Sequence, residues 1–288
     1  MKKWKILAHD DLDGVVSAVL LSILLKTNKV KFDIYDKKSK VDKNTIVTDL
    51  PYHKGCGLWF DHHISNKTNK KFKGKFVLEK SCARVIYNYY NKNFSEYYKD
   101  LVKKVDKADS GGYTTKDIKS YNKTYLIDRI GFLAPFKNKK EKKLFLRIMF
   151  DHFKNRKSFD DLFKIKRIKN FIEKIKMLDK KSIIFIKKKG IIKNKTLIID
   201  SSIEKITLNP FFIYINYPKC KYILIISKNK NKIEILVTFN KFYKTKNVSN
   251  IGKILNKFGG YGHKFIGGCR IESKNKDRII NEILGKLK

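Results

Sequence analysis

Short apolar runs that end beside histidine or aspartate alternate with helical segments over the first 90 residues. Three runs precede a metal-binding type of side chain: Lys5–Ala8 before His9, Thr45–Thr48 before Asp49, and Gly57–Phe60 before Asp61. The other predicted elements here are strands at Lys31–Tyr35 and Phe76–Leu78 and helices at Val15–Leu25 and Ala83–Tyr90. Such alternation predicts parallel βαβ units, in which ligands bind beyond the carboxyl ends of the strands.

The pattern changes in the second half of the chain. Between about Lys116 and Lys180, apolar residues recur at intervals of three and four, which predicts helices. Strand-like runs follow at Ile183–Lys187, Thr196–Asp200, Phe211–Ile215, Tyr222–Ser227 and Ile233–Thr238. A predicted helix at Asn250–Phe258 comes after them. Because 288 residues exceed the usual size of one core, we predict an α/β protein with an N-terminal parallel-sheet domain (1–125), a helical connector (126–182) and a smaller C-terminal α/β domain (183–288).

The segment HDDLDG at residues 9–14 concentrates side chains that bind metals. His9, Asp11 and Asp13 alternate, so they project together if the chain leaves the strand in extended form, whereas Asp10 points elsewhere. Gly14 lets the chain turn into a helix whose N-terminus favours anionic groups of a substrate. Carboxylates this close raise one another's pKa. A divalent cation would remove that conflict.

Two further segments, IVTDLP and WFDHHIS, place Asp49, Asp61, His62 and His63 at the next strand ends. A helix cap or a satisfied polar network would explain any one of them alone, but not the whole set. Mixed aspartate and histidine ligands suit Mn²⁺, Mg²⁺ or Zn²⁺. Two such ions about 3.5–4 Å apart bind the oxygens of a phosphate and hold a hydroxide for in-line attack. The set therefore predicts phosphoester hydrolysis.

A glycine-rich segment, GGYGHKFIGGC, follows the last predicted helix. Glycines let backbone N–H groups approach an anion closely, although such a segment is usually only a turn. Tyr261 either stacks on a base or caps the loop, and the sequence leaves both open. His263 is in addition a catalytic candidate, and with Lys264 it contacts either the scissile phosphate or the terminus of the nucleotide. The candidate substrate-binding residues are Gly259, Gly260, Gly262, His263 and Lys264.

The amino-acid composition bears on the binding partner of the protein and on its location. The net charge of +40 is explained equally by a polyanionic partner such as nucleic acid and by the codon usage of an AT-rich genome. Four scattered cysteines, Cys56, Cys82, Cys220 and Cys269, include no CxxC pair, which favours a reducing, cytoplasmic location. No apolar stretch reaches the roughly 18 residues that a membrane helix needs. We expect a protein without a membrane anchor.

These motifs together resemble the DHH phosphoesterase superfamily: HxDxDG, an aspartate in TDLP, DHH, and VDKADSGG as the fourth motif. The segment GGYGHKFIGG resembles the GGGH motif of the DHH-associated C-terminal domain of RecJ-like exonucleases and nanoRNase-type oligoribonucleases. The resemblance spans residues 9–268. It departs from the family at Tyr261, where a third glycine is usual, and at Ile266 and Gly267, where alanines are common. These departures bear on substrate choice more than on catalysis.

The resemblance implies a role for each residue. His9 and Asp11 would hold one metal ion and Asp49 would bridge to a second. The second ion would be completed by Asp13, His62 and the aspartate of the fourth motif. For that aspartate both Asp106 and Asp109 are available, and Asp109 is preferred because DSGG places it at a loop. The catalytic candidates are then His63 facing the phosphate, Asp61 orienting the histidine pair, and His263.

The leading hypothesis is a manganese-dependent nuclease or nanoRNase that removes nucleotides from short RNA or single-stranded DNA with two divalent ions. A small-molecule phosphatase or phosphodiesterase acting on a bisphosphonucleotide or cyclic dinucleotide is the alternative within the same fold. A non-catalytic nucleic-acid-binding module is the alternative of another class, against which the complete ligand set argues. The sequence leaves the oligomeric state open, with a homodimer as one candidate.

Overall fold

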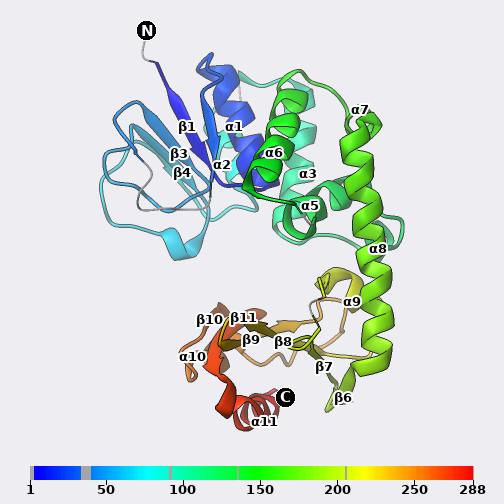
Figure 1. Cartoon of the computed structure of the whole chain (residues 1–288). Helices are drawn as coiled ribbons and strands as arrows, with labels where there is room; N and C mark the ends of the chain where they lie inside the picture. Colours follow the sequence, from blue (N-terminus) through cyan, green and yellow to red (C-terminus); the bar gives the residue numbers. More distant parts are fainter. Residues whose placement is uncertain (1–2, 34–39, 91–92, 135, 205, 288) are drawn as a thin grey trace. The chain divides into compact units, whose positions relative to one another are not determined.

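A computed structural model describes residues 3–33, 40–90, 93–134, 136–204 and 206–287 (Figure 1). They form two compact units, Met1–Ile175 and Lys176–Lys288. The boundary between the units falls within helix α8 (Lys166–Lys189), inside the expected connector. The finer domain limits at 125 and 182 stay a prediction. In the described ranges, no helix has both the length and the apolar character to cross a membrane.

The first unit is built on a five-stranded sheet in which every neighbouring pair is parallel, as predicted. Its spatial order is β2-β1-β3-β4-β5. The strands are β1 (Lys5–Ala8), β2 (Val30–Phe32), β3 (Thr45–Thr48), β4 (Leu58–Asp61) and β5 (Gly74–Phe76). Tyr35, the expected end of the second strand, lies outside the described residues.

Helices cover one face of this sheet (Figure 1). Helix α1 (Leu12–Leu24) is buried from Leu12 to Ser22 and packs against β1, α2, α3 and α6. The other face is covered by loop side chains, including Tyr52 and Phe72, that pack around the buried Trp59. The remaining helices of this unit are α2 (Cys82–Tyr89), α3 (Glu96–Asp109), α4 (Thr115–Lys119), α5 (Lys123–Leu133), α6 (Lys139–Lys154), α7 (Phe159–Lys164) and the 3₁₀ turn η1 (Ile64–Asn66).

The second unit contains a six-stranded mixed sheet of order β10-β11-β9-β8-β7-β6, in which only β7 and β8 are parallel. Its strands are β6 (Ile191–Lys193), β7 (Thr196–Asp200), β8 (Tyr222–Asn229), β9 (Lys232–Phe239), β10 (Tyr261–His263) and β11 (Ile266–Glu272). Its helices are α9 (Pro210–Asn216), α10 (Ile251–Asn256), α11 (Lys276–Lys286) and the 3₁₀ turn η3 (Ser273–Asn275).

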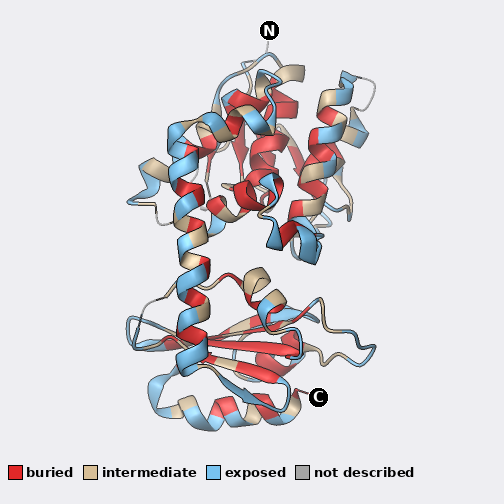
Figure 2. Ribbon diagram, turned by 90° about the vertical axis from the view of Figure 1, so that its right-hand side faces the viewer, coloured by how far each residue is buried: buried red, intermediate tan, exposed pale blue. Residues whose placement is uncertain are grey.

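Each face of this second sheet has its own core, and the buried residues concentrate there (Figure 2). One core joins the sheet to α10 and α11, with Leu255 and Ile283 fully buried. The other joins it to α9 and the end of α8 through Ile213 and Phe185. The α/β class predicted for this region is therefore confirmed.

Two predicted strands of this region are wrong. Ile183–Lys187 belongs to α8, where Ile184 is exposed but Phe185 and Ile186 are buried, as a helix with one apolar stripe requires. Phe211–Ile215 lies in α9, which begins at Pro210, a residue favoured in the first turn of a helix. Short apolar runs do not distinguish a buried strand from a buried helical turn.

Candidate metal and phosphate site

The strand ends of the first sheet bring the predicted residues to one edge. In the parallel register, Ala8 pairs with Thr48, and Thr48 pairs with Phe60. The strands β1, β3 and β4 therefore end level with one another. His9 and Asp49 follow directly, and Asp61 is the last residue of β4. The site thus arises from register in a parallel sheet, where neighbouring strands finish at the same edge.

The HDDLDG segment turns from β1 into α1 through Asp11, the N-cap residue of the helix. Oδ1 of Asp11 accepts a hydrogen bond from the backbone N–H of Gly14 (2.9 Å), and its Oδ2 lies 2.6 Å from Nδ1 of His9. A Cβ atom at Gly14 would lie 2.2 Å from the backbone oxygen of His9, so only glycine allows this close approach. Asp10 points away, as predicted, and forms an ion pair with Lys142 of α6 (2.7 Å).

Asp13 lies in the first turn of α1 and is buried. Its carboxylate accepts hydrogen bonds from the backbone N–H groups of Cys82 (2.6 Å) and Ala83 (2.8 Å), the first two residues of α2. Asp13 therefore links the N-terminus of α1 to the N-terminus of α2. Oδ1 also accepts a hydrogen bond from the hydroxyl of Ser17 (3.4 Å), so Oδ2 is the oxygen that keeps a lone pair for another ligand.

Asp49 has the most unusual surroundings in the site. Its backbone is left-handed (φ 58°), and its N–H donates to the carbonyl oxygen of Phe60 (3.0 Å). The side chain is 1% exposed, and neither carboxylate oxygen has a hydrogen-bond partner among the described residues. A buried carboxylate without a donor is costly, so both the strained backbone and the orphaned oxygens point to a cationic ligand.

The DHH segment orients two imidazole rings in different ways. Nδ1 of His62 lies 3.1 Å from the carbonyl oxygen of Glu79, so the neutral ring carries its proton there and presents the lone pair of Nε2. This Nε2 is buried without a partner among the described residues. It lies 3.6 Å from Asp13 and Asp49 and 3.4 Å from Asp109. His62 is thus oriented as a metal ligand.

Asp61 orients His63 through a contact with Nδ1 of the His63 ring. Oδ1 of Asp61 lies 2.9 Å from Nδ1 of His63 and also accepts the backbone N–H groups of His62 and His63, while Oδ2 accepts a bond from Asn66 (2.6 Å). This hydrogen bond raises the pKa of His63 above its usual value, even though burial lowers it. The side chain of His63 is 43% exposed, so its Nε2 is available as a donor to a ligand.

The two candidate aspartates of the fourth motif have different surroundings. Asp106 is fully engaged, because it accepts hydrogen bonds from the hydroxyl of Ser81 (2.7 Å) and from Nε and Nη2 of Arg84 (2.9 and 2.6 Å). Asp109, the last residue of α3, instead lies beside His62. The geometry thus places Asp109 with the other acidic side chains and Asp106 in an ion pair between α2 and α3.

The carboxylates repel one another strongly. Burial and the charge of Asp11 raise the pKa of Asp13 to about 7. Burial, followed by the charges of Asp13 and Asp11, raises the pKa of Asp109 to about 9 and that of Asp49 well above its ordinary value. Burial lowers the pKa of His62, which keeps its ring neutral. Neutral imidazole beside acids that lack a counter-charge is the electrostatic signature of a cation site.

Three overlapping sets of residues have ligand atoms within 4.8 Å of one another: His9 with Asp11 and Asp49; Asp13 with His62 and Asp109; and Asp49 with His62 and His63. Asp49 belongs to two sets that otherwise share no residue, so it lies between two groups of ligands. The oxygen and nitrogen donors fit Mn²⁺, Mg²⁺ or Zn²⁺. The residues therefore fit divalent metal ions.

The glycine-rich segment forms a hairpin rather than a loop. Tyr261–His263 is strand β10, paired antiparallel with β11, and the two strands are joined by Lys264 and Phe265. Gly262 has φ 147°, and a Cβ there would lie 2.4 Å from Cα of Gly267. Gly259 and Gly260 precede the hairpin, and Gly262 lies within it. The glycines of the hairpin make close strand pairing possible, and the substrate-binding role of the segment stays a prediction.

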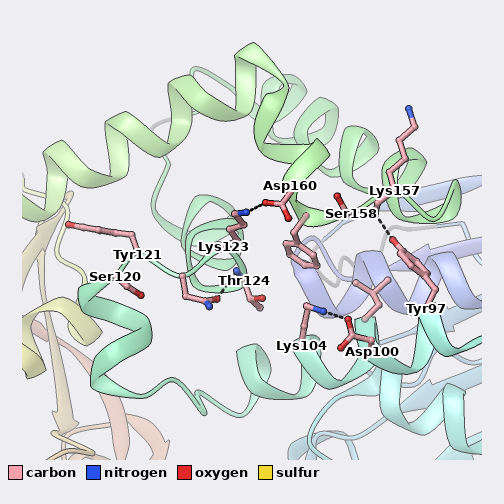
Figure 3. A pocket seen from close by; sticks show the side chains of 13 residues that line it. Tyr97, Asp100, Lys104, Ser120, Tyr121, Lys123, Thr124, Lys157, Ser158 and Asp160 are labelled. Carbon is pink, nitrogen blue, oxygen red and sulfur yellow. Dashed lines mark hydrogen bonds and ion pairs between the residues drawn. The ribbon is translucent and has the colours of Figure 1, made fainter.

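A hollow of about 580 Å³ between α3, α5 and α7 contains none of the predicted site residues (Figure 3). Two of its lysines, Lys104 and Lys123, are already paired with Asp100 and Asp160. Its chemistry is therefore that of ordinary surface ion pairs, and the acidic cluster at the strand ends remains the candidate site.

Sequence reasoning missed several residues that hold this site. Asn66 binds Asp61, the carbonyl of Glu79 orients His62, and Lys142 pairs with Asp10. These roles depend on contacts between residues far apart in the sequence, so no local pattern indicates them.

No family model and no curated protein matches this sequence. Solved structures do match over nearly its whole length, and one of them is the DHH domain of a member of a ribosomal-protein family: 13% identity, TM-score 0.62, covering 99% of this chain and 88% of that one. The chain therefore shares its fold with a DHH domain, as the motifs predicted.

The pGpG-specific phosphodiesterase PggH from Vibrio cholerae matches with a TM-score of 0.79 at 24% identity, covering 98% of both chains. RecJ from Thermus thermophilus in complex with Mn²⁺ matches with a TM-score of 0.61 at 10% identity, covering 98% of this chain and 51% of RecJ. The similarity therefore extends over both units.

Proposed function

We propose that this protein is a two-metal phosphoesterase that hydrolyses phosphodiester bonds in short oligonucleotides. The observation that carries the proposal is the pair of ligand groups around Asp49, whose buried oxygens and the neighbouring Nε2 of His62 have no hydrogen-bond partner among the described residues. Such an arrangement is costly without cations and becomes favourable with them.

Each residue then has a defined task. His9, Asp11 and Asp49 would hold one ion, and Asp13, His62 and Asp109 would complete the second, with Asp49 between them. Bound divalent ions would neutralise the phosphate oxygens and make water more acidic, which is the chemistry that phosphoester hydrolysis needs. Manganese is the proposed metal, since the RecJ structures were obtained with Mn²⁺ or Mg²⁺.

His63 and Asp61 would act on the substrate rather than on the metal. Asp61 fixes the tautomer and the direction of the His63 ring by a hydrogen bond of 2.9 Å. A raised pKa favours the protonated ring, which donates a hydrogen bond to a phosphate oxygen. His63 would thus position the phosphate and stabilise the negative charge that builds up on it.

One observation favours a short nucleic-acid substrate: the similar fold of PggH belongs to an enzyme that acts on pGpG. The net charge of +40 is compatible with a polyanion, although codon usage explains it equally well. A small-molecule phosphodiester such as a cyclic dinucleotide is the second candidate, because pGpG is itself only two nucleotides long. Hydrolysis rates on a panel of di- to pentanucleotides, cyclic dinucleotides and bisphosphonucleotides separate the two.

The test of the proposal is hydrolysis with Mn²⁺ by the full chain and by its Asp49→Asn variant. Wild-type protein should release mononucleotides from di- to pentanucleotides, and Asp49→Asn should lose nearly all of this activity. Asp151→Asn, which removes an exposed carboxylate on α6, is the matched control and should match wild type. Folded wild-type protein that releases no mononucleotide, or an Asp49→Asn variant with undiminished activity, would refute the assignment.

A further inference from the structure

A hollow of about 480 Å³ in the first unit lies between the start of α6 and the first turns of α8, and none of the predicted site residues lines it. Four cations line it: Lys137, Lys166, Arg167 and Lys174. The one carboxylate in its lining, Glu141, accepts the backbone N–H of Lys137 through Oε2 (2.6 Å). Among the described residues, none of the four cations forms an ion pair with a carboxylate. The hollow therefore has a local excess of positive charge.

Arg167 distinguishes this hollow from the lysine-rich surface elsewhere on the chain. Codon usage explains abundant lysine, but it does not explain arginine, of which the chain has only seven. The guanidinium group of Arg156 lies 5.7 Å from the centre of the Tyr98 ring. Five others form ion pairs with carboxylates: Arg84, Arg129, Arg147, Arg270 and Arg278. Within the part of the chain that the structure describes, Arg167 has neither kind of partner, so its guanidinium group is available to a ligand.

Packed aromatic rings fix one wall of the hollow. Phe171 lines it, is 2% exposed, and lies with its ring centre 5.0 Å from that of Phe136 and 6.0 Å from that of Phe145. The ammonium group of Lys174 lies 5.5 Å from the centre of the Phe171 ring. Because this packing fixes the backbone that carries the cations, a ligand does not have to order it on binding.

Helix α6 connects this hollow to the HDDLDG segment. Glu141 lines the hollow, and the next residue, Lys142, forms an ion pair with Asp10 (2.7 Å). A ligand in the hollow would therefore lie one residue along α6 from a contact that holds HDDLDG in place. Both a free ligand and a strand that extends from the acidic cluster are compatible with this position.

We propose that this hollow binds a ligand with two or more adjacent phosphate groups. The planar guanidinium group of arginine matches two oxygens of a phosphate, and lysines neutralise neighbouring phosphates as point charges. The inference goes beyond the proposed function, because the site lies outside the acidic cluster and needs no metal ion. Two sources offer this chemistry: a free polyphosphate group and the backbone of a nucleic-acid strand.

The experiment measures binding of inorganic tripolyphosphate to the full chain by isothermal titration in EDTA, at about 0.15 M salt, where distant surface charges are screened. Arg167→Gln should weaken binding at least about tenfold, because charge-assisted hydrogen bonds are lost. Arg167→Lys should bind with intermediate strength, since it keeps the charge but loses the planar pair of donors. The matched control is Lys169→Gln, which removes an exposed lysine of α8 that does not line the hollow and should bind like wild type.

The proposal is overturned if wild type binds no tripolyphosphate, or if Lys169→Gln weakens binding as much as Arg167→Gln does. Competition in the same buffer identifies the source. A pentanucleotide that displaces tripolyphosphate indicates a nucleic-acid strand, whereas one that does not displace it indicates a free polyphosphate group. Because EDTA removes divalent ions, binding here is independent of hydrolysis. Binding that depends on Arg167, without any hydrolysis in Mn²⁺, would refute the proposed activity and leave this site standing.

Discussion

The acidic cluster of the first unit and the glycine-rich hairpin of the second are built in opposite ways. In the cluster, Asp13 and Asp49 are buried. Two backbone N–H groups hold Asp13, whereas the carboxylate of Asp49 has no hydrogen-bond donor among the described residues and is unfavourable without a cation. In the hairpin, functional side chains are exposed and the glycines beside them contribute only close backbone approach. A substitution in the cluster therefore disturbs the buried core of the first unit, whereas a substitution in the hairpin changes an exposed surface.

The comparison predicts that substitutions in the cluster lower activity more than substitutions in the hairpin do. The largest loss should follow His62→Ala. Removal of partners that only orient metal ligands typically lowers activity 10- to 100-fold, so loss of a ligand should lower kcat/KM by more than about a hundredfold. The measurement is dinucleotide hydrolysis at saturating Mn²⁺. Loss of less than tenfold would remove His62 from the metal site.

Repulsion between the carboxylates of the cluster also predicts how the free energy of unfolding of the metal-free protein depends on pH. The pKa of Asp13 is raised to about 7 and that of Asp109 to about 9, so the folded state binds more protons than the unfolded chain above pH of about 4. The free energy of unfolding should therefore fall as pH rises from 5 to 8. Urea denaturation in EDTA measures this slope.

Two comparisons test that interpretation of the slope. Mn²⁺ at about 100 times its Kd should add about 2.7 kcal/mol and flatten the slope. The Asp49→Asn variant should be more stable than wild type at pH 8 without metal, because one buried charge is gone. A metal-free protein whose stability is constant from pH 5 to 8 would contradict the repulsion.

A smaller effect is expected from Asp61→Asn. This change keeps the shape of the side chain but weakens the hydrogen bond that orients His63 and raises its pKa. We expect a 10- to 100-fold lower kcat with nearly unchanged metal affinity, and a lower apparent pKa for the protonated group in the pH profile of kcat. An unshifted profile would show that Asp61 has only a structural role.

The smallest effect concerns the ion pair between Asp10 and Lys142, which links the HDDLDG segment to α6 at 2.7 Å. Both side chains are partly exposed, so the pair is worth about 0–1 kcal/mol. Lys142→Ala should lower activity less than tenfold, and Lys142→Arg should restore most of the loss. Kinetics at low and high salt check this. Salt screens the ion pair in wild type and should therefore lower its activity, whereas Lys142→Ala has no pair to screen. A loss above a hundredfold would place Lys142 in direct contact with substrate.

The sequence predicted what depends on local pattern. Alternating runs predicted the parallel sheet, and spacing brought His9, Asp49 and Asp61 to one edge. The departures arise from tertiary context. Phe185 lies in a helix because its apolar run continues the stripe of α8, and Tyr261 lies in a strand because four glycines allow β10 and β11 to pair closely. Neither environment is visible in a window of neighbouring residues.

The contact of Asp13 with the first two amides of α2 couples the site to the backbone in a way that spectroscopy can follow. When the carboxyl of Asp13 is neutral, its hydrogen bonds from the N–H groups of Cys82 and Ala83 are weaker. When it is ionised beside cations, these hydrogen bonds are stronger. Solvent exchange of these two backbone protons would therefore slow as ions load. The exchange rate of these two protons at the start of α2 would thus report how much metal is bound, without any substrate.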